Sequence, residues 1–327
     1  TRKGDLDEIL NERVLRVLVV NDNANFYLNE GRQDGLHVSL MREFERWVNK
    51  RYYPQQKLKL NLVFLPVRHD QLLPMLNAGK GDLVLANLSP TAERRKQVDF
   101  SIPEMSGLQE WLVSSDQVEP IRQLTDLSGK HVWVRKSSSY YESLQTLNDM
   151  LRSLHREPVH IEQADELLQD GDLLQMVDAG EIPFTLVDSH HAKLWDRVFS
   201  HLRFHDQLPL RTQGETAWAF RKNSPRLAAE VNAFLREYRQ GTAKGEPLYR
   251  RYLQQAPGFA KRFLRGTTER MGWSTVEYQR YAPLFQRYAE RYQLDWMMLL
   301  AQAYQESTLN QGARLRQGAL GVMQVLP

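Results

Sequence analysis

A single glutamate near the end of an apolar helical pattern is the residue best placed to do acid–base chemistry. Asp295 is a good helix N-cap, and the apolar residues that recur after it at helical spacing are Trp296, Leu299, Leu300 and Ala303. Glu306 comes three positions after Ala303, so we expect it on the same buried face. Burial raises the pKa of a carboxyl group, and a carboxyl that stays protonated can act as a general acid. The alternative is a helix-terminal glutamate that points into solvent.

A second set of residues has the chemistry of a carboxylate-binding site. Ser89, Thr91 and Arg94 follow a predicted strand and open a short basic helix. Backbone N–H groups at a helix start, hydroxyl groups and a guanidinium fork all donate hydrogen bonds to a carboxylate. The alternative is that Thr91 only caps the helix, while Arg94 lies on a solvated face with Arg95 and Lys96.

The elements expected around this second set are those of an α/β protein. Apolar or alternating runs predict strands over 14–20, 58–64 and 82–87. Helical spacing predicts helices over 36–47 and over 69–78, the second capped by Asp70. Strands that alternate with helices predict a mostly parallel sheet.

A second α/β unit is expected after Lys130. Its predicted elements are strands over 131–135 and 184–188, a Ser-rich turn at 137–139 and a helix over 140–153. Residues 225–253 have a helical pattern, and residues 254–258 have the composition of a linker. Everything after this linker is expected to be helical.

Composition bounds the possible functions. The chain has 327 residues with 43 Lys and Arg against 40 Asp and Glu, a net charge of +3 that is too weak to indicate a nucleic-acid partner. The absence of cysteine excludes disulfides, thiolate metal sites and cysteine nucleophiles. No apolar stretch approaches the roughly 18 residues of a membrane span. Because Thr1 is not an initiator methionine, we expect that an N-terminal segment has been removed.

Residues 10–255 resemble the periplasmic amino-acid-binding proteins of solute-binding family 3. The segments that carry the resemblance are 14–20, 35–38, 79–101 and 126–139. The resemblance implies a two-lobed α/β fold, with one lobe at about 10–106 and 213–256 and the other at about 107–212.

The same resemblance implies a ligand site between the lobes. Ser89, Thr91 and Arg94 would hold the ligand α-carboxylate, together with the helix start at Ser137, Ser138 and Ser139. Asp188 would receive the α-amine, although by itself it could be a helix cap. The residues that would cover the ligand side chain, or could instead pack as core, are Asn25, Phe26 and Tyr27. Asn87 stands where many relatives have glycine.

Residues 257–327 resemble the beginning of a lytic transglycosylase domain. The segments that match are 303–307, with its Glu-Ser pair, and 318–324, with Val322 where the Gly-Leu-Met-Gln motif has leucine. The resemblance implies an all-α lysozyme-like fold in which Glu306 is catalytic, Ser307 orients the site, and Met323 and Gln324 line the glycan groove. Later motifs of the domain have no counterpart before Pro327, so we expect an incomplete groove and an inactive 327-residue chain.

A solute-binding domain at 1–256 followed by this domain is the architecture of a group of membrane-bound lytic murein transglycosylases. The resemblance therefore implies cleavage of peptidoglycan to 1,6-anhydro products, with no cofactor or metal. It also implies a periplasmic, outer-membrane-associated location and regulation by a cell-wall peptide or amino acid. The rival hypothesis is a periplasmic receptor or regulator with a non-catalytic helical tail.

Overall fold

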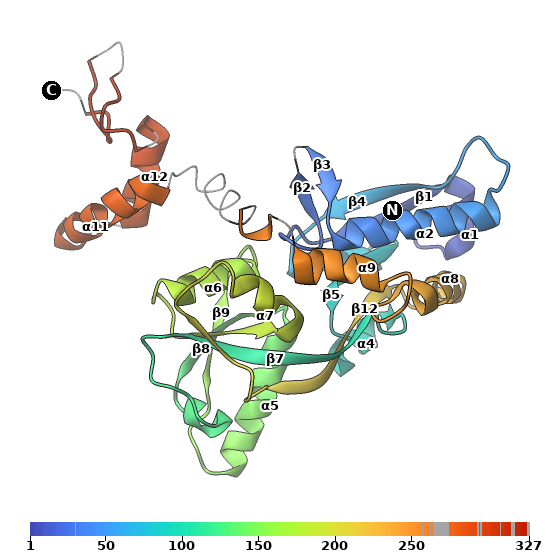
Figure 1. The fold of residues 1–327 in the computed structure, drawn as a ribbon, viewed down its shortest axis with the longest axis horizontal. Helices are drawn as coiled ribbons and strands as arrows, with labels where there is room; N and C mark the ends of the chain where they lie inside the picture. Colours follow the sequence, from blue (N-terminus) through green and yellow to red (C-terminus); the bar gives the residue numbers. More distant parts are fainter. Residues whose placement is uncertain are drawn as a thin grey trace. The chain divides into compact units, whose positions relative to one another are not determined.

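The computed structural model forms two compact units, Thr1–Phe259 and Ala260–Pro327, and each is described by itself. It describes the chain apart from a few positions: 30, 257, 262, 264–274, 293, 295, 308, 315–317 and 326–327. The expected cap Asp295 and part of the expected linker therefore lie outside the described residues. The first unit holds two α/β lobes, so the predicted two-lobed fold is confirmed (Figure 1).

The first lobe is built on three parallel strands, β1 (Val14–Val19), β4 (Asn61–Pro66) and β5 (Leu83–Leu88). Strand β1 lies between the other two, so the chain leaves it toward one side and then returns to the other. The carboxyl ends of β1 and β5 meet where the strand order reverses, which is where open α/β sheets bind ligands. Two short strands, β2 (Tyr27–Asn29) and β3 (Arg32–Asp34), form a hairpin after β1.

Helices cover this sheet with their apolar faces. The helices of the first lobe are α1 (Leu6–Glu12), α2 (Leu36–Tyr52), α3 (Leu72–Asn77), α4 (Ala92–Gln97), α8 (Pro225–Tyr238) and α9 (Glu246–Tyr249). In α2 the buried Leu36, Leu40, Phe44 and Val48 repeat every four residues, which places them on one helix face. The predicted cap at Asp70 is wrong, because a 3-10 turn (His69–Gln71) precedes α3 and Asp70 lies inside it, where its carboxylate accepts from Arg68.

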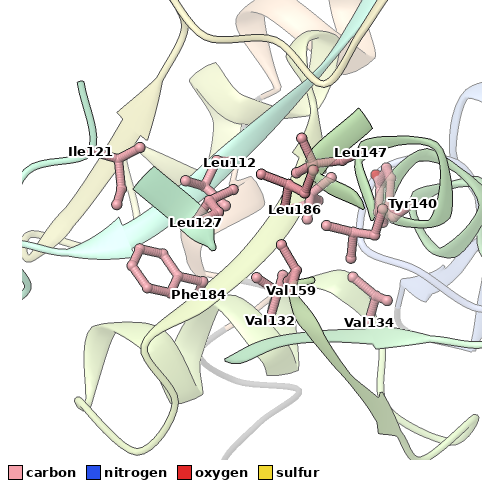
Figure 2. Close-up of a cluster of buried hydrophobic side chains, with 12 residues drawn as sticks. Leu112, Ile121, Leu127, Val132, Val134, Tyr140, Leu147, Val159, Phe184 and Leu186 are labelled. Carbon is pink, nitrogen blue, oxygen red and sulfur yellow. The ribbon is translucent and has the colours of Figure 1, made fainter. Parts of the chain in front are cut away.

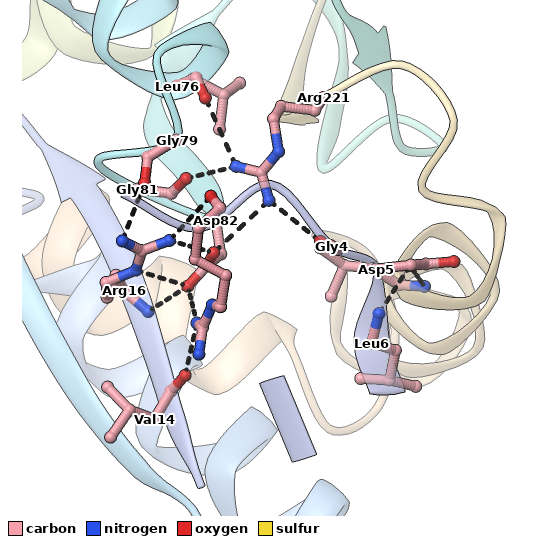
Figure 3. A network of polar contacts seen from close by, with 12 residues as sticks. Gly4, Asp5, Leu6, Val14, Arg16, Leu76, Gly79, Gly81, Asp82 and Arg221 are labelled. Atoms are coloured by element: carbon pink, nitrogen blue, oxygen red, sulfur yellow. Dashed lines mark hydrogen bonds and ion pairs between the residues drawn. The ribbon is translucent and has the colours of Figure 1, made fainter. Parts of the chain in front are cut away.

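A buried ion network closes the amino-terminal edge of this sheet (Figure 3). Asp82, which is fully buried just before β5, contacts the guanidinium groups of Arg2, Arg16 and Arg221. Burial by itself raises the pKa of Asp82, but hydrogen bonds from Arg16 and Arg2 outweigh it, so the pKa lies below its usual range. The network fastens the N-terminal segment to β1 and β5 at the edge opposite their carboxyl ends.

Two long strands, β7 (Met105–Ser115) and β12 (Arg211–Phe220), run from one lobe into the other (Figure 1). Strand β12 pairs with β5 and with β6 (Asp99–Phe100) in the first lobe, and it also pairs with β7. Strand β7 continues into the second lobe, where it pairs with β10 (Phe184–Asp188) and β11 (Leu202–His205). The lobes are thus joined through one continuous sheet.

The second lobe has its own apolar core. Its remaining elements are η2 (Leu124–Leu127), β8 (His131–Arg135), β9 (His160–Ala164), α5 (Ser139–Ser153), α6 (Asp170–Asp178) and α7 (Ser189–Trp195). Figure 2 shows side chains of β7, β8, β10 and α5 meeting in this core, among them Leu112, Val132, Leu186 and Leu147. The strands and the helix predicted in this lobe are confirmed within one residue at each end.

The helical run expected over 225–253 is interrupted. Helix α8 ends at Tyr238, Arg239 is extended, and Gly241 has a φ of 82° that a continuous helix does not allow. Helix α9 and the helical turn η3 (Arg250–Gln255) come next, and left-handed Ala256 ends them.

The described residues of the second unit include the helices α11 (Thr275–Tyr292) and α12 (Trp296–Ser307). The expectation that everything after the linker is helical is wrong, because residues after α12 form turns and isolated antiparallel bridges of Leu320 with Arg314 and Val325. Leu300, Ala303, Leu309 and Val322 pack together as a small core. None of the helices in the described part of the chain is long and apolar enough to cross a membrane.

Candidate functional sites

The turn after β1 presents an unsatisfied amide at the ligand edge of the first lobe. The Asp22 carboxylate accepts hydrogen bonds from the backbone N–H groups of Ala24 (2.8 Å) and Asn25 (2.5 Å), and from Asn25 Nδ2 (2.8 Å). Asn25 is 1% exposed, and its Oδ1 has no hydrogen-bond partner among the described residues. Phe26 packs against Phe64 with ring centroids 5.5 Å apart, which is the packing role that the sequence left open.

Arg94 lies between the two lobes. Thr91 is the N-cap of α4, as its sequence position allowed, and its hydroxyl accepts from the Arg94 N–H at 3.4 Å. The Arg94 guanidinium donates to the carbonyl of Ser89 (2.9 Å) in the first lobe and to that of Ser137 (2.7 Å) in the second. Burial lowers the pKa of Arg94, and Glu142 acts against this. Arg94 therefore faces the interlobe contact rather than the solvated basic face.

The hydroxyl groups expected to hold a ligand carboxylate contact carboxylates of the protein itself. Thr91 donates to Glu142 at 2.9 Å across the lobe boundary, and Ser139 donates to Glu110 at 2.8 Å. The backbone N–H of Ser137 donates to Glu166 at 3.0 Å, and its hydroxyl at 2.5 Å.

Two other hydroxyls of the expected set make weaker or purely local contacts. Ser138 donates to the Arg135 carbonyl at 2.7 Å within its own turn. The Ser89 hydroxyl donates to the Ser139 hydroxyl at 3.5 Å. In this state a ligand would have to compete with these internal partners for the helix start.

Asp188 stands at the end of β10, as predicted, and its carboxyl group is not used as a helix cap. It occupies the N-cap position of α7 without a side-chain capping bond. Burial raises the pKa of Asp188 well above its usual range, and the neighbouring Glu110 and Asp170 raise it further. A ligand ammonium group beside Asp188 would stabilise the ionised carboxylate and so lower the raised pKa.

Sequence reasoning missed Glu110, which is 2% exposed and lies directly opposite Asp188 in the β7–β10 register. Ser139 and Ser143 donate to its two carboxylate oxygens, and Arg211 Nε lies 3.7 Å from it. The signal available in the sequence was a single charged residue in the mostly apolar segment 108–113. His190 and His191, which come after Asp188 in the first turn of α7, were missed as well.

In the second unit, the two motifs of the sequence lie together. The Ser307 hydroxyl lies 3.1 Å from the carbonyl of Ala303 and 2.7 Å from that of Val322. Gln324 Nε2 donates to the carbonyls of Gly321 (2.6 Å) and Ala313 (3.2 Å), which holds the turn that contains Val322. Met323 packs against the small core.

The expectation of a buried Glu306 is wrong, because its side chain is exposed. With 3.6 residues per turn, Ser307 lies within roughly 20° of Leu300 around the helix, whereas Glu306 lies roughly 120° from it. Ser307 therefore takes the packed position, and Glu306 borders the face rather than entering it. Among the described residues, no group of three or more His, Cys, Asp and Glu side chains is arranged to hold a metal ion.

Comparison with known proteins identifies the first unit. Residues 15–255 match the family model of the bacterial extracellular solute-binding proteins, family 3. The chain belongs to this family. Residues 283–327 match the transglycosylase SLT domain, so the predicted order of the two domains is confirmed.

Curated relatives share both parts of the chain. It is 27% identical over 318 residues to membrane-bound lytic murein transglycosylase F of Desulfosudis oleivorans, covering 94% of this chain and 63% of the relative. It is 28% identical over 329 residues to the protein of the same name from Pseudomonas fluorescens Pf-5, covering 98% and 62%. The chain thus spans about three fifths of the length of these relatives.

Solved structures of amino-acid-binding proteins share the fold of the first unit. An ancestral arginine-binding protein bound to arginine has a TM-score of 0.58 at 22% identity, covering 73% of this chain and 97% of its own. A binding component of an ABC transporter from Wolinella succinogenes, complexed with lysine, has a TM-score of 0.60 at 18% identity, covering 74% and 96%.

Proposed function

We propose that the protein is a peptidoglycan lytic transglycosylase whose solute-binding domain senses a cell-wall peptide or amino acid. The observation that carries the enzymatic part is the 2.7 Å hydrogen bond between Ser307 and the Val322 carbonyl, because it joins the Glu-Ser segment to the Gly-Val-Met-Gln segment. The named relatives and the SLT match at 283–327 support the same activity. We place the protein in the periplasm at the outer membrane, in keeping with the membrane-bound relatives.

In the proposed reaction one carboxyl group acts twice. Glu306 donates its proton to the leaving oxygen as the β-1,4 bond between N-acetylmuramic acid and N-acetylglucosamine breaks. The resulting carboxylate then accepts the proton of the C6 hydroxyl, whose oxygen bonds to C1 of the same sugar. The product is a 1,6-anhydro ring, and no water is consumed. Ser307 would orient the site, while Met323 and Gln324 would line the glycan groove.

A second candidate is suggested by the exposure of Glu306, since its side chain lacks the buried, apolar surroundings expected of a general acid. The protein would then be a receptor or regulator with a non-catalytic helical tail.

Mass spectrometry of sacculi digested by the natural full-length protein distinguishes the two candidates. We expect 1,6-anhydromuropeptides, their loss in Glu306→Gln, and wild-type levels in the exposed control Glu119→Gln. Hydrated reducing ends as the main product would instead identify a hydrolase. An active Glu306→Gln would remove the catalytic assignment, and no cleavage by the wild-type protein would favour the receptor.

For the sensor, we propose that Arg94 contacts the ligand α-carboxylate and Asp188 the α-amine. Arg94 contacts both lobes, and the Asp188 carboxyl group lies near Glu110 and Asp170, whose negative charges raise its pKa. A ligand held by both residues would favour the closed arrangement of the lobes, because only that arrangement offers both contacts. The arginine and the lysine in the two related structures both have this pair of groups.

Calorimetry with free amino acids and cell-wall stem peptides tests this assignment. Arg94→Ala should weaken binding by about 2–5 kcal/mol, the usual effect of removing one partner of a buried charge pair. The exposed control Arg95→Ala should bind as the wild-type protein does. Unchanged affinity in both Arg94→Ala and Asp188→Ala would make the domain a scaffold rather than a sensor.

The segment from the end of α8 at Tyr238 to Phe259, here called the connector, contacts both lobes. These contacts support the proposed regulation. Tyr249 donates to Glu104 at 3.2 Å, and Tyr252 donates to Asp34 at 2.8 Å, both in the first lobe. Phe259 packs against Trp195 of α7 in the second lobe, with ring centroids 4.9 Å apart. Helix α7 starts directly after Asp188, so ligand binding and the connector share one short element.

A further inference from the structure

Several buried polar atoms around the ligand edge have no hydrogen-bond partner among the described residues. They are Asn25 Oδ1, Asn87 Oδ1, both ring nitrogens of His190, and Nε2 of His191. Burying polar groups without partners is costly, and folded proteins rarely leave several such groups near one edge of a domain. A bound molecule that supplies hydrogen bonds would account for them.

The amide orientation of Asn25 is determined by its neighbour. Asn25 Nδ2 lies 2.8 Å from the Asp22 carboxylate, which can only accept a hydrogen bond. The nitrogen must therefore face Asp22, and the buried Oδ1 must be the free end of the amide. A ligand atom that meets Asn25 here must be a donor.

Asn87 brings a second amide to the same edge. The parallel register pairs Val19 of β1 with Leu85 of β5, so Asn87 lies level with Asn21, just before the Asp22 turn. Its φ of 50° is a left-handed conformation that asparagine adopts more readily than most residues. This explains how asparagine can stand where many relatives have glycine, and it adds an unpartnered Oδ1 to the site.

The two histidines reach this edge from the second lobe. Their rings lie 4.0 Å apart at the start of α7. Burial lowers the pKa of both, so each is a neutral imidazole with one nitrogen able to accept a hydrogen bond. Helix α7 packs on η3, whose Tyr252 hydroxyl lies 2.9 Å from Ser39 Oγ and 2.8 Å from the Asp34 carboxylate in the first lobe. The backbone N–H of His37, close to Ser39 in α2, donates to the Asn25 carbonyl at 2.9 Å, so η3 links the start of α7 to the Asn25 turn.

We propose that Asn25, Asn87, His190 and His191 form a subsite for the ligand side chain, and that this subsite selects a side chain ending in an N–H donor. The inference rests on the proposed sensor function, in which Arg94 and Asp188 contact the α-amino carboxylate. All four residues offer acceptor atoms, and the Asp22 carboxylate behind Asn25 favours a positive charge. An amine or guanidinium side chain is therefore recognised, and an aliphatic one is excluded.

Calorimetry with matched amino acids tests the subsite on the wild-type 327-residue chain. The probes are L-lysine against L-norleucine, which lacks the terminal amine, and L-arginine against L-citrulline, which keeps N–H donors but loses the charge. We expect lysine to bind at least tenfold more tightly than norleucine, and citrulline to bind between arginine and norleucine. Equal affinity for lysine and norleucine would overturn the subsite but leave the sensor function standing. Binding of none of the four would overturn the subsite, and the sensor function would fall with it only if the stem peptides also failed to bind.

Variants locate the selectivity in these residues. Asn25→Leu, of similar size, should bring the lysine and norleucine affinities within about threefold of each other by weakening lysine alone. Because Asn25 also holds the Asp22 turn, His190→Leu provides a second variant with the same expected outcome. The control Asn61→Leu, on the exposed start of β4, should keep the wild-type preference. A full lysine preference in both subsite variants would contradict the assignment.

Discussion

At the scale of single residues, Asp188 has opposite effects on folding and on binding. Its carboxyl group is buried, lies opposite Glu110 and makes no helix cap. Its raised pKa means that the folded chain disfavours the ionised form, which the unfolded chain carries above a pKa of about 3.9. At neutral pH Asp188 therefore destabilises the ligand-free fold, while its charge is what a ligand amine would bind.

Asp188→Asn should accordingly stabilise the ligand-free chain at pH 7 by about 1 kcal/mol, a usual size for a single substitution. Because the wild-type carboxyl is protonated in both states below pH about 4, the gain should vanish there. Urea unfolding at pH 4 and pH 7 measures both values. The surface control Asp149→Asn should change stability little at either pH. A variant that is less stable than wild type at pH 7 would show that the charge supports the fold.

At the scale of elements, the residues that stabilise the sheet of the first lobe and the residues proposed to bind ligand lie at opposite edges of that sheet. The Arg2, Arg16 and Arg221 network around Asp82 closes the amino ends of β1 and β5, and the candidate ligand contacts lie beyond their carboxyl ends. A change in the network alters how firmly the strands are held, and it leaves the groups that face the ligand in place.

Asp82→Asn should cost about 3–5 kcal/mol at pH 7, because it leaves three buried or partly buried guanidinium groups around a neutral amide. The pKa of Asp82 is lowered in the fold, so its contribution is present above the unfolded value of about 3.9 and is lost as pH falls below it. Urea unfolding across pH 3–7 tests this dependence. Glu12→Gln, which removes the exposed partner of Arg2, should cost less than about 1 kcal/mol.

Ligand affinity of the folded Asp82→Asn variant should equal that of the wild-type chain. Calorimetry at a temperature well below its unfolding transition measures it. A loss of affinity as large as the loss of stability would mean that the network also shapes the ligand edge.

At the scale of the whole molecule, the proposed regulation of the second unit by ligand binding would act through the connector. Trp195 and Phe259 join α7 to residues just before that unit, while Tyr249 and Tyr252 hold the connector to the first lobe. A change in the angle between the lobes cannot satisfy both anchors at once, so one of them must yield. The ring contact of Phe259 with Trp195 is the part of the second-lobe attachment that lies closest in sequence to the second unit.

Phe259→Ala should therefore uncouple the two parts of the full-length protein. We expect effector affinity to stay within about twofold of wild type, while lytic activity no longer responds to the effector. Calorimetry and a sacculus-release assay measure the two quantities on the same preparation. An activity that responds to the effector as in the wild-type protein would show that the coupling runs elsewhere.

The sequence by itself determined the alternation of strands and helices in the first unit and the positions of Arg94, Asp188 and Ser307 in their elements, while the resemblance of its segments to known families implied the two lobes and the order of the two domains. These depend on local periodicity, on capping and on short motifs, which neighbouring residues decide. Only the tertiary structure decided that Glu110 lies opposite Asp188 and that Glu306 lies outside the packed face. It also decided that Glu142 and Glu166 accept hydrogen bonds from hydroxyl groups that the sequence assigned to the ligand. The partner of a polar group is set by pairing between residues far apart in the chain. No local pattern encodes which carboxylate will reach which serine once the strands have aligned.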